Sequence, residues 1–293
     1  MNKLRLLGVN TVHYNIDEVL NHGLCRFEVC FGRQQNYKNR IKEINNEIEF
    51  GFNKGLIVSV HHPILLFDWY KEDYLSAFYL DLNNEISEKS FRLLEENIKE
   101  YSKQKIAYFV VHFPGVVLKG EKPRGFDSLL NERIERVNNI ASKYDVLILL
   151  EYFGSNKWFY DVDKWIEVTK KCSNIGILTD TGHLHFASIM HNFNFMEALK
   201  KLSKHSEAFH LWTTKGNEVY SDSKYYKSYH HISANINQRV NDGWAFNTKE
   251  VLDVILKYDK PIIIESEPLY GGVKYLDESL KSIITYIKEK YDE

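Results

Sequence analysis

Residues 146–151 read Val-Leu-Ile-Leu-Leu-Glu, an unbroken apolar run that ends at a carboxylate. A second run, residues 175–178, ends in the same way at Thr179 and Asp180. Apolar runs of about four to eight residues without alternation are typical of strands buried on both faces, as in parallel sheets. These two stretches therefore predict parallel strands with an acidic group at the C-terminal end of each.

Similar runs recur along the chain and alternate with longer amphipathic stretches. The expected strands are residues 4–9, 25–31, 56–60, 106–111, 146–150, 175–178, 208–209 and 262–264. Between them, residues 87–105 place Phe91, Leu94 and Ile98 at the spacing of one helical face, and residues 129–143 follow the same pattern. Strands that alternate with helices predict βαβ units and a parallel sheet.

About eight such units in 293 residues give about 37 residues per unit, a normal length for the βα repeat of a closed barrel. We therefore expect an α/β fold, a single (β/α)8 TIM barrel that occupies residues 1–293 as one domain. An open doubly wound sheet is the alternative, which the absence of Gly-x-Gly-x-x-Gly after the first strand weakens. Residues 213–247 are too long for a simple connection and predict an excursion of a late loop.

Composition excludes several classes of protein. Hydrophobic residues make up 44% and charged residues 27% of the chain, which is enough apolar material for a sizeable core. The 38 basic and 40 acidic residues give a net charge of −2, so nucleic acid is a possible partner but not a favoured one. Three cysteines fit a reducing compartment. No apolar run approaches the roughly 20 residues of a membrane span, and no signal peptide is evident, so we expect a cytoplasmic protein.

Side chains that can bind a metal follow nearly every apolar run. They are His61 or His62, His112, Glu151, Asp180, His210 and Glu265. In a barrel the C-terminal ends of the strands converge on one face, where active sites form. Packing carboxylates and imidazoles there without a cation would leave charges desolvated, so the set predicts a divalent metal site. His183 follows Asp180 by one helical turn, and at least one residue of the pair His230-His231 is expected to reach the cluster.

These residues resemble the xylose-isomerase-like TIM barrel superfamily, which contains endonuclease IV and many sugar isomerases and epimerases. The resemblance covers roughly residues 56 to 270 and is most specific in the element Asp180-Thr181-Gly182-His183. It implies a central metal site that both branches share, formed by Glu151, Asp180, His210 and Glu265. In the hydrolase branch it implies up to three zinc ions.

In that branch a second metal, bridged by Glu151, would be bound by His112 and by one of His61 or His62. A third would be bound by His183 and His231, with His230 as a possible substitute ligand. Two departures stand out: Tyr229 occupies a position where that branch has Asp, and residues 7–11, Leu-Gly-Val-Asn-Thr, lack the Gly-Ala-His-Val-Ser opening of the DNA-repair enzymes.

Two reactions compete for this site. Two metals about 4 Å apart clamp the attacking and leaving oxygens of a phosphoester and activate a water. One metal suits sugar or sugar-phosphate isomerisation or epimerisation, with Glu151 and Glu265 as the acid/base pair. Because an isomerase has no evident need for imidazoles from residues 61–62 and His112, the sequence favours a phosphoester hydrolase. A binding module without catalysis is the third hypothesis. The expected cofactor is one to three Zn²⁺ ions, or Mn²⁺.

The substrate is expected to be small and phosphorylated or sugar-like. Trp212, Lys215 and Arg239 lie in late loops and are candidates for contacts with it. Aromatic residues near loop ends can stack on a sugar or a base, although packing of the loops over the barrel is the more common reason for them.

Overall fold

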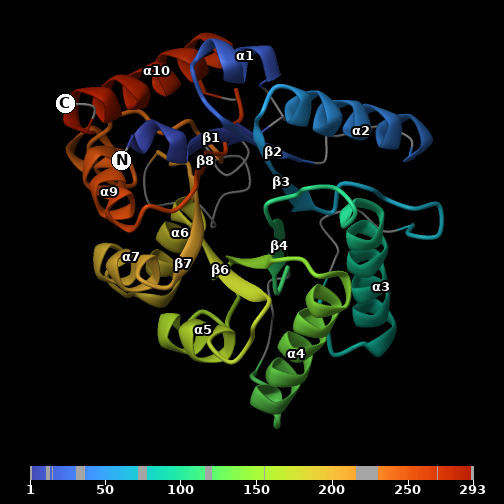
Figure 1. Cartoon of the computed structure of the whole chain (residues 1–293). Coiled ribbons are helices and arrows are strands. Elements are labelled where there is room, and N and C mark those ends of the chain that lie inside the picture. Colours follow the sequence, from blue (N-terminus) through green and yellow to red (C-terminus); the bar gives the residue numbers. More distant parts are fainter. Residues whose placement is uncertain are drawn as a thin grey trace. The chain divides into compact units, whose positions relative to one another are not determined.

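The structure is a computed structural model that describes residues 2–10, 14, 16–30, 37–71, 78–115, 121–154, 156–215, 230–268 and 270–291. Its strands form a closed barrel in the order β1 to β8 (Figure 1). They are β1 Leu7–Asn10, β2 Arg26–Val29, β3 Ile57–His62, β4 Phe109–Phe113, β5 Ile148–Tyr152, β6 Ile175–Asp180, β7 Ser206–Leu211 and β8 Ile262–Ile264. The predicted TIM barrel is confirmed.

Helices follow the strands along the chain, as the amphipathic stretches predict. They are α1 Ile16–Asn21, α2 Tyr37–Asn53, α3 Asn84–Tyr101, α4 Phe126–Tyr144, α5 Val162–Thr169, α6 Thr181–His191, α7 Phe195–Ser203, α9 Thr248–Ile255 and α10 Gly272–Tyr291. Short 3₁₀ turns occupy η1 Lys3–Leu6, η3 Val240–Asp242 and η4 Leu256–Tyr258.

Several strands extend beyond the apolar runs that predict them. The strand expected over residues 106–111 is β4, which continues to Phe113, and the strand expected over 146–150 is β5, which continues to Tyr152. In the ladder between these two strands His112 is the partner of Glu151. His112 and Glu151 thus lie within the strands, one residue before the end of each.

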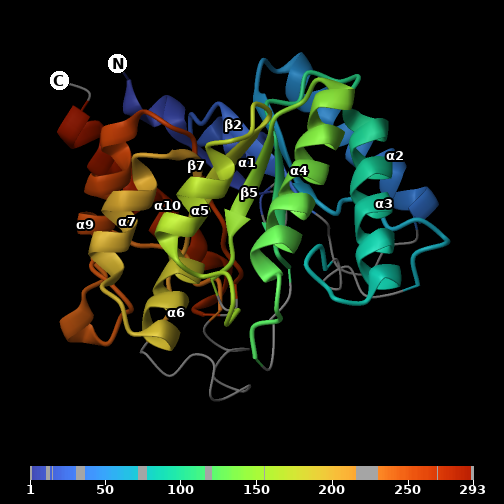
Figure 2. The same cartoon turned by 90° about the horizontal axis from the view of Figure 1, so that it is seen from below.

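The chain divides into two compact units, Glu28–Leu178 and Met1–Phe27 with Thr179–Glu293. Whether residues 1–293 behave as a single domain stays a prediction. In the unit Glu28–Leu178, parallel pairing runs from β3 through β4 and β5 into β6. Helices α3 and α4 lie side by side (Figures 1 and 2) and bury the faces that the helical spacing predicts, including Phe91 and Leu130.

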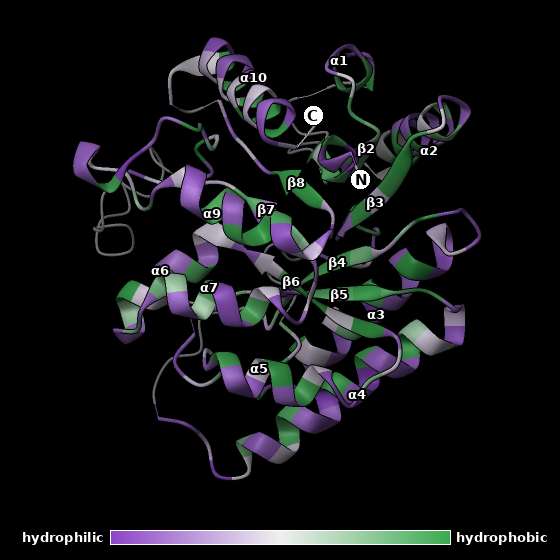
Figure 3. Cartoon of the chain, turned by 60° about the vertical axis from the view of Figure 1, so that its left-hand side comes forward, coloured by the Kyte–Doolittle hydropathy of each residue, from purple (hydrophilic) through white to green (hydrophobic). Residues whose placement is uncertain are grey.

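Hydropathy follows the barrel layers of this unit. Strands β4 and β5 are mainly hydrophobic along their length, whereas α4 alternates between hydrophobic and hydrophilic residues (Figure 3). The loop after β3 is held by Asn97 on α3, whose side-chain oxygen accepts from the backbone N–H groups of Ile64 and Leu65 at 3.2 and 2.9 Å. Its amide group donates to the carbonyl oxygens of Leu65 and Leu93.

In the other unit, β1, β8 and β7 pair in parallel, and all three residues of β8 are buried. Helix α6 begins at Thr181, directly after β6, and the side chain of Asp180 caps it by accepting from the backbone N–H of His183. The residues from Thr181 to Ser188 are all buried, so this helix has no solvent face over its first two turns. It is therefore part of the core.

The predicted excursion over residues 213–247 is partly described, since residues 216–229 lie outside the described residues. Its ends are paired, because isolated antiparallel bridges join Thr213 to Ile232 and Lys215 to Trp244. Within the described residues no helix has the length and apolar character that a membrane span requires. The cytoplasmic location stays a prediction.

Candidate metal centre

Three predicted residues meet at the ends of β3, β4 and β5. Nε2 of His61 lies 3.0 Å and Nε2 of His112 lies 3.2 Å from the same oxygen, Oε2 of Glu151. The two imidazole rings are edge to face, with centroids 4.7 Å apart. Glu151 is fully buried, whereas the side chain of His112 is 29% exposed. The candidate ligand atoms of all three residues lie within 4.8 Å of one another.

His62 does not join this group, and its role as a metal ligand stays a prediction. Successive residues on a strand point to opposite faces, so when His61 faces Glu151 its neighbour faces away. Within the part of the chain that the structure describes, neither ring nitrogen of His62 has a hydrogen-bond partner. Burial, followed by the charges of His61 and His112, lowers the pKa of His62 to about 3, so the ring is neutral at neutral pH. Of the two residues, His61 is the one placed with Glu151.

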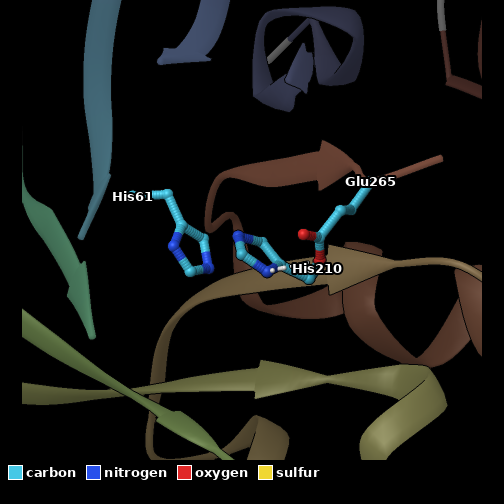
Figure 4. Close-up of side chains that lie close together, drawn as sticks. All are labelled: His61, His210 and Glu265. Atoms are coloured by element: carbon cyan, nitrogen blue, oxygen red, sulfur yellow. Dashed lines mark ion pairs between the residues drawn. The ribbon is translucent and has the colours of Figure 1, made fainter. Parts of the chain in front are cut away.

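A second group lies in the other unit, at the ends of β6, β7 and β8. Nδ1 of His210 lies 3.1 Å from Oε2 of Glu265, the ion pair that Figure 4 draws as a dashed line, and 3.8 Å from Oδ2 of Asp180. The candidate ligand atoms of these three residues are within 4.8 Å of one another. Asp180 and His210 have no exposed surface.

The chemistry of this second donor set fits a divalent cation. Two carboxylates and an imidazole are the ligands that Zn²⁺ and Mn²⁺ take from proteins. Desolvated carboxylates this close together repel one another, and a bound cation offsets that cost. Asp180, His210 and Glu265 therefore form a three-ligand set suited to a metal with open coordination positions.

A further cluster forms where a third metal is predicted, but with a different composition. His230, His231 and Glu267 have candidate ligand atoms within 4.8 Å of one another, and the two imidazoles are stacked with centroids 3.7 Å apart. The backbone N–H of Glu267 donates to the carbonyl oxygen of His231. The ring of His183 is 6.2 Å from that of His231 between centroids, and His183 belongs to none of these ligand groups. Tyr229 lies outside the described residues.

Glu267 was not among the predicted site residues. Its signal in the sequence is weak, since it lies two positions after Glu265 and beyond the last apolar residue of β8. Only the return of the chain at residues 230–232 brings His231 beside it, and no local pattern encodes that return.

The residues predicted to contact substrate each have partners within the protein. Trp212 is fully buried, and its indole N–H donates to Oδ2 of Asp180 at 2.6 Å. The guanidinium group of Arg239 donates to the carbonyl oxygens of Ile236 and Gln238 in its own loop. The ammonium group of Lys215 lies over the rings of Trp244 and Tyr270. Trp212 is therefore enclosed by the surrounding residues, and contact of Lys215 or Arg239 with a substrate stays a prediction.

The fold of this chain is similar to those of several solved barrel structures. A D-tagatose 3-epimerase-like protein is 19% identical, covers 97% of this chain and 98% of its own, and has a TM-score of 0.63. The apo form of a 3-keto-D-glucoside 4-epimerase from E. coli is 12% identical, covers 97% and 99%, and has a TM-score of 0.61. A xylose isomerase-like TIM barrel protein from Mycobacterium smegmatis in complex with magnesium is 13% identical, covers 97% and 96%, and has a TM-score of 0.57.

At these identities the likeness concerns the fold. No curated protein matches the chain by sequence. A family model does match it: the xylose isomerase-like TIM barrel model covers residues 16–286, nearly the whole chain. Together with the closed barrel of eight strands, this match shows that the chain belongs to the xylose isomerase-like TIM barrel family.

Proposed function

We propose that this protein is a metal-dependent sugar isomerase or epimerase, in which Asp180, His210, Glu265 and Glu151 hold one divalent cation. The observation that carries the proposal is the buried set of Asp180, His210 and Glu265, whose candidate ligand atoms are within 4.8 Å of one another. Glu151 on β5 is added as the fourth ligand because β5 precedes β6 in the closed strand order and active sites of such barrels form at the C-terminal strand ends.

A divalent cation in this site would polarise the adjacent oxygens of a bound sugar. The protein must then move a proton to or from a carbon next to a carbonyl group, which requires a base and an acid. Glu151 and Glu265 are proposed for these roles. In epimerisation one carboxylate removes the proton from one face of the carbon and the other, in its acid form, returns a proton to the opposite face, so that the substrate gains and loses one proton.

In this scheme His61 and His112 are not ligands of a second metal, the role that favoured a hydrolase, but neighbours of Glu151. Both present a nitrogen to Oε2 of Glu151, at 3.0 and 3.2 Å. An imidazole N–H beside a carboxylate oxygen stabilises the anion and restricts its rotation. We propose that these imidazoles orient Glu151, which gives an isomerase the use for them that the sequence alone did not suggest.

Phosphoester hydrolysis is the second candidate, favoured by one observation. The ligand atoms of His61, His112 and Glu151 are close enough together to hold a metal of their own, which Glu151 would share as a bridging carboxylate. Against it, two of the similar structures are a sugar epimerase and an epimerase-like protein, and none of those compared above is described as a hydrolase.

Proton exchange with solvent tests the proposed reaction directly. Protein reconstituted separately with Mn²⁺, Mg²⁺, Zn²⁺ and Co²⁺ is incubated in D₂O with a panel of ketopentoses, ketohexoses and their phosphates, and deuterium incorporation is followed by NMR. Exchange at a carbon next to the carbonyl is expected for at least one sugar and only with metal. A parallel panel of phosphomonoesters and phosphodiesters covers the second candidate.

Matched variants locate the chemistry. Glu151→Gln and Glu265→Gln are expected to lose at least about 100-fold in exchange rate, since each removes one proton-transfer group. Glu167→Gln, on the exposed surface of α5, is the control and is expected to keep the wild-type rate. Absence of exchange for every sugar, together with metal-dependent phosphate release, would replace the isomerase proposal by the hydrolase.

A further inference from the structure

Trp212 is joined to a proposed metal ligand by a single short hydrogen bond. Its indole N–H donates to Oδ2 of Asp180 at 2.6 Å, and neither residue has exposed surface. We infer that Trp212 is a positioning residue, which fixes the carboxylate of Asp180 for metal binding through this N–H. The inference rests on the proposed metal site and adds to it a residue that belongs to none of its ligands.

Both oxygens of the Asp180 carboxylate accept hydrogen bonds. Oδ1 accepts from the backbone N–H of His183 at 2.6 Å, and Oδ2 accepts from the indole of Trp212. A carboxylate oxygen accepts in two directions, so each oxygen keeps one direction for a cation. With only the helix cap in place the group could still turn about its Cβ–Cγ bond. The second donor removes that freedom and fixes the directions of the remaining lone pairs.

The first two residues of helix α6, Thr181 and Gly182, also hold the tryptophan. The hydroxyl of Thr181 donates to the carbonyl oxygen of Trp212 at 2.9 Å and accepts from its backbone N–H at 3.2 Å. Gly182 touches the face of the indole so closely that a Cβ there would come within 2.3 Å of two ring atoms. Asp180, Thr181 and Gly182 thus bind the indole N–H, the backbone and the ring of one residue.

Packing alone does not explain a tryptophan at this position. A phenylalanine would fill an apolar site without a buried N–H that needs an acceptor. Trp165 offers a comparison within the same chain, because it is equally buried and donates to a neutral acceptor, the carbonyl oxygen of Phe159, at 3.4 Å. The bond to Asp180 is much shorter, as expected for a charge-assisted hydrogen bond.

The test is the affinity for metal ions of Trp212→Phe, which keeps a ring in the core and removes the N–H. Dissociation constants for Zn²⁺ and Co²⁺ are measured by competition with a chromophoric chelator. Loss of a group that orients a metal ligand typically weakens binding by about 10- to 100-fold, and we expect a loss in this range. The visible spectrum of the Co²⁺ form should also change, because the geometry of one ligand is no longer fixed.

Trp165→Phe is the matched control. It removes an indole of equal burial whose N–H contacts no proposed ligand, so it is expected to lower the stability without altering the Co²⁺ spectrum or the dissociation constant. Asp180→Asn completes a double-mutant cycle. If Trp212 acts through the carboxylate, Trp212→Phe has little further effect in the Asp180→Asn background, and the two changes are not additive.

A wild-type measurement guards against a variant that fails to fold. In protein labelled with ¹⁵N in its tryptophans, Zn²⁺ is expected to shift the indole N–H resonance of Trp212 and to leave that of Trp165 in place. An unshifted Trp212 resonance, or a Trp212→Phe variant with wild-type affinity and spectrum, overturns the inference while the metal site stands. A wild-type protein that binds neither metal overturns the proposed function and this inference together.

Discussion

Nε2 of His61 lies 3.0 Å from Oε2 of Glu151, a carboxylate with no exposed surface. A buried carboxylate needs donors that satisfy its oxygens, and an imidazole N–H is a strong one. The next residue, His62, is also buried, and yet neither of its ring nitrogens has a hydrogen-bond partner among the described residues. Two adjacent histidines therefore differ in what they contribute to the site, and this difference can be tested.

His61→Phe is expected to reduce the rate of the proposed sugar reaction by about 10- to 100-fold, because Glu151 loses a group that orients it. His62→Phe is the matched control. It removes two unsatisfied ring nitrogens from the core and is expected to leave the rate unchanged and the stability equal or higher. Steady-state kinetics and urea unfolding of both variants provide the measurements. Equal loss of activity in the two variants would contradict the assigned roles.

His112→Ala separates the two candidate functions by counting ions. In the isomerase proposal His112 orients Glu151, so the variant keeps one tightly bound ion per chain. In the hydrolase alternative His112 is a ligand, and the count falls from two ions to one. Elemental analysis after dialysis measures the count.

In the wild type, removal of metal by a chelator should lower the melting temperature, since a cation at 100 times its Kd stabilises the folded state by about 2.7 kcal/mol.

Much of the fold follows from the sequence, because unbroken apolar runs such as residues 146–150 have few other structures available in an α/β chain. The ends of the strands are less predictable. His112 and Glu151 lie within β4 and β5 and are partners across the ladder, which the apolar runs that stop before them do not indicate.

The candidate site is predictable in its ligand types and only partly in its members. Asp180, His210 and Glu265 follow apolar runs directly, and the structure brings them together. The choice between His61 and His62 depends on which face of β3 is turned inward, and both follow the same predicted strand, residues 56–60. The role of Trp212 depends on one hydrogen bond to a residue on another strand, which no local pattern encodes.

Stability should fall in acid through His185 on α6. Burial lowers the pKa of His185 to about 4, although a hydrogen bond to the backbone of Ala245 opposes the shift. The unfolded chain takes up this proton near the usual pKa of 6.5, so between about 6.5 and 4 it binds more protons than the folded state, and stability decreases as the pH falls. The loss attributable to this residue is up to roughly 3 kcal/mol.

His185→Phe is expected to remove that part of the pH dependence. Its ring would still pack against Phe195 and Phe246, which contact the imidazole in the wild type. Urea unfolding at about pH 7 and about pH 4.5 gives, for each protein, the change in unfolding free energy between the two pH values. His191→Gln, on the same helix but partly exposed, serves as the control and should keep the wild-type dependence of unfolding free energy on pH. If His185→Phe keeps the wild-type dependence of unfolding free energy on pH, other groups cause the acid sensitivity.

The loop after β3 should depend on Asn97. Its side chain makes four hydrogen bonds with the backbone of Ile64, Leu65 and Leu93, and it is buried. Asn97→Leu keeps the volume and leaves those backbone groups without partners, which is expected to cost about 2 to 4 kcal/mol of unfolding free energy. Asn97→Asp keeps the acceptor for Ile64 and Leu65 but turns a buried carboxylate oxygen toward the carbonyl oxygens of Leu65 and Leu93, so at neutral pH it should lose at least as much. Urea midpoints measure both variants, and a leucine variant with wild-type stability would contradict the role.

Helix α6 starts at the residue after Asp180 and has no solvent face over its first two turns. A segment so enclosed can open only when the surrounding core opens with it, so its amide hydrogens should exchange with solvent only during rare, large-scale excursions of the protein. Since the cap bond from His183 ties one oxygen of the carboxylate to this helix and the indole of Trp212 holds the other, the direction in which Asp180 points is fixed in the same way. An arriving ion would then meet a group that is already in place, and little reorganisation would accompany its capture.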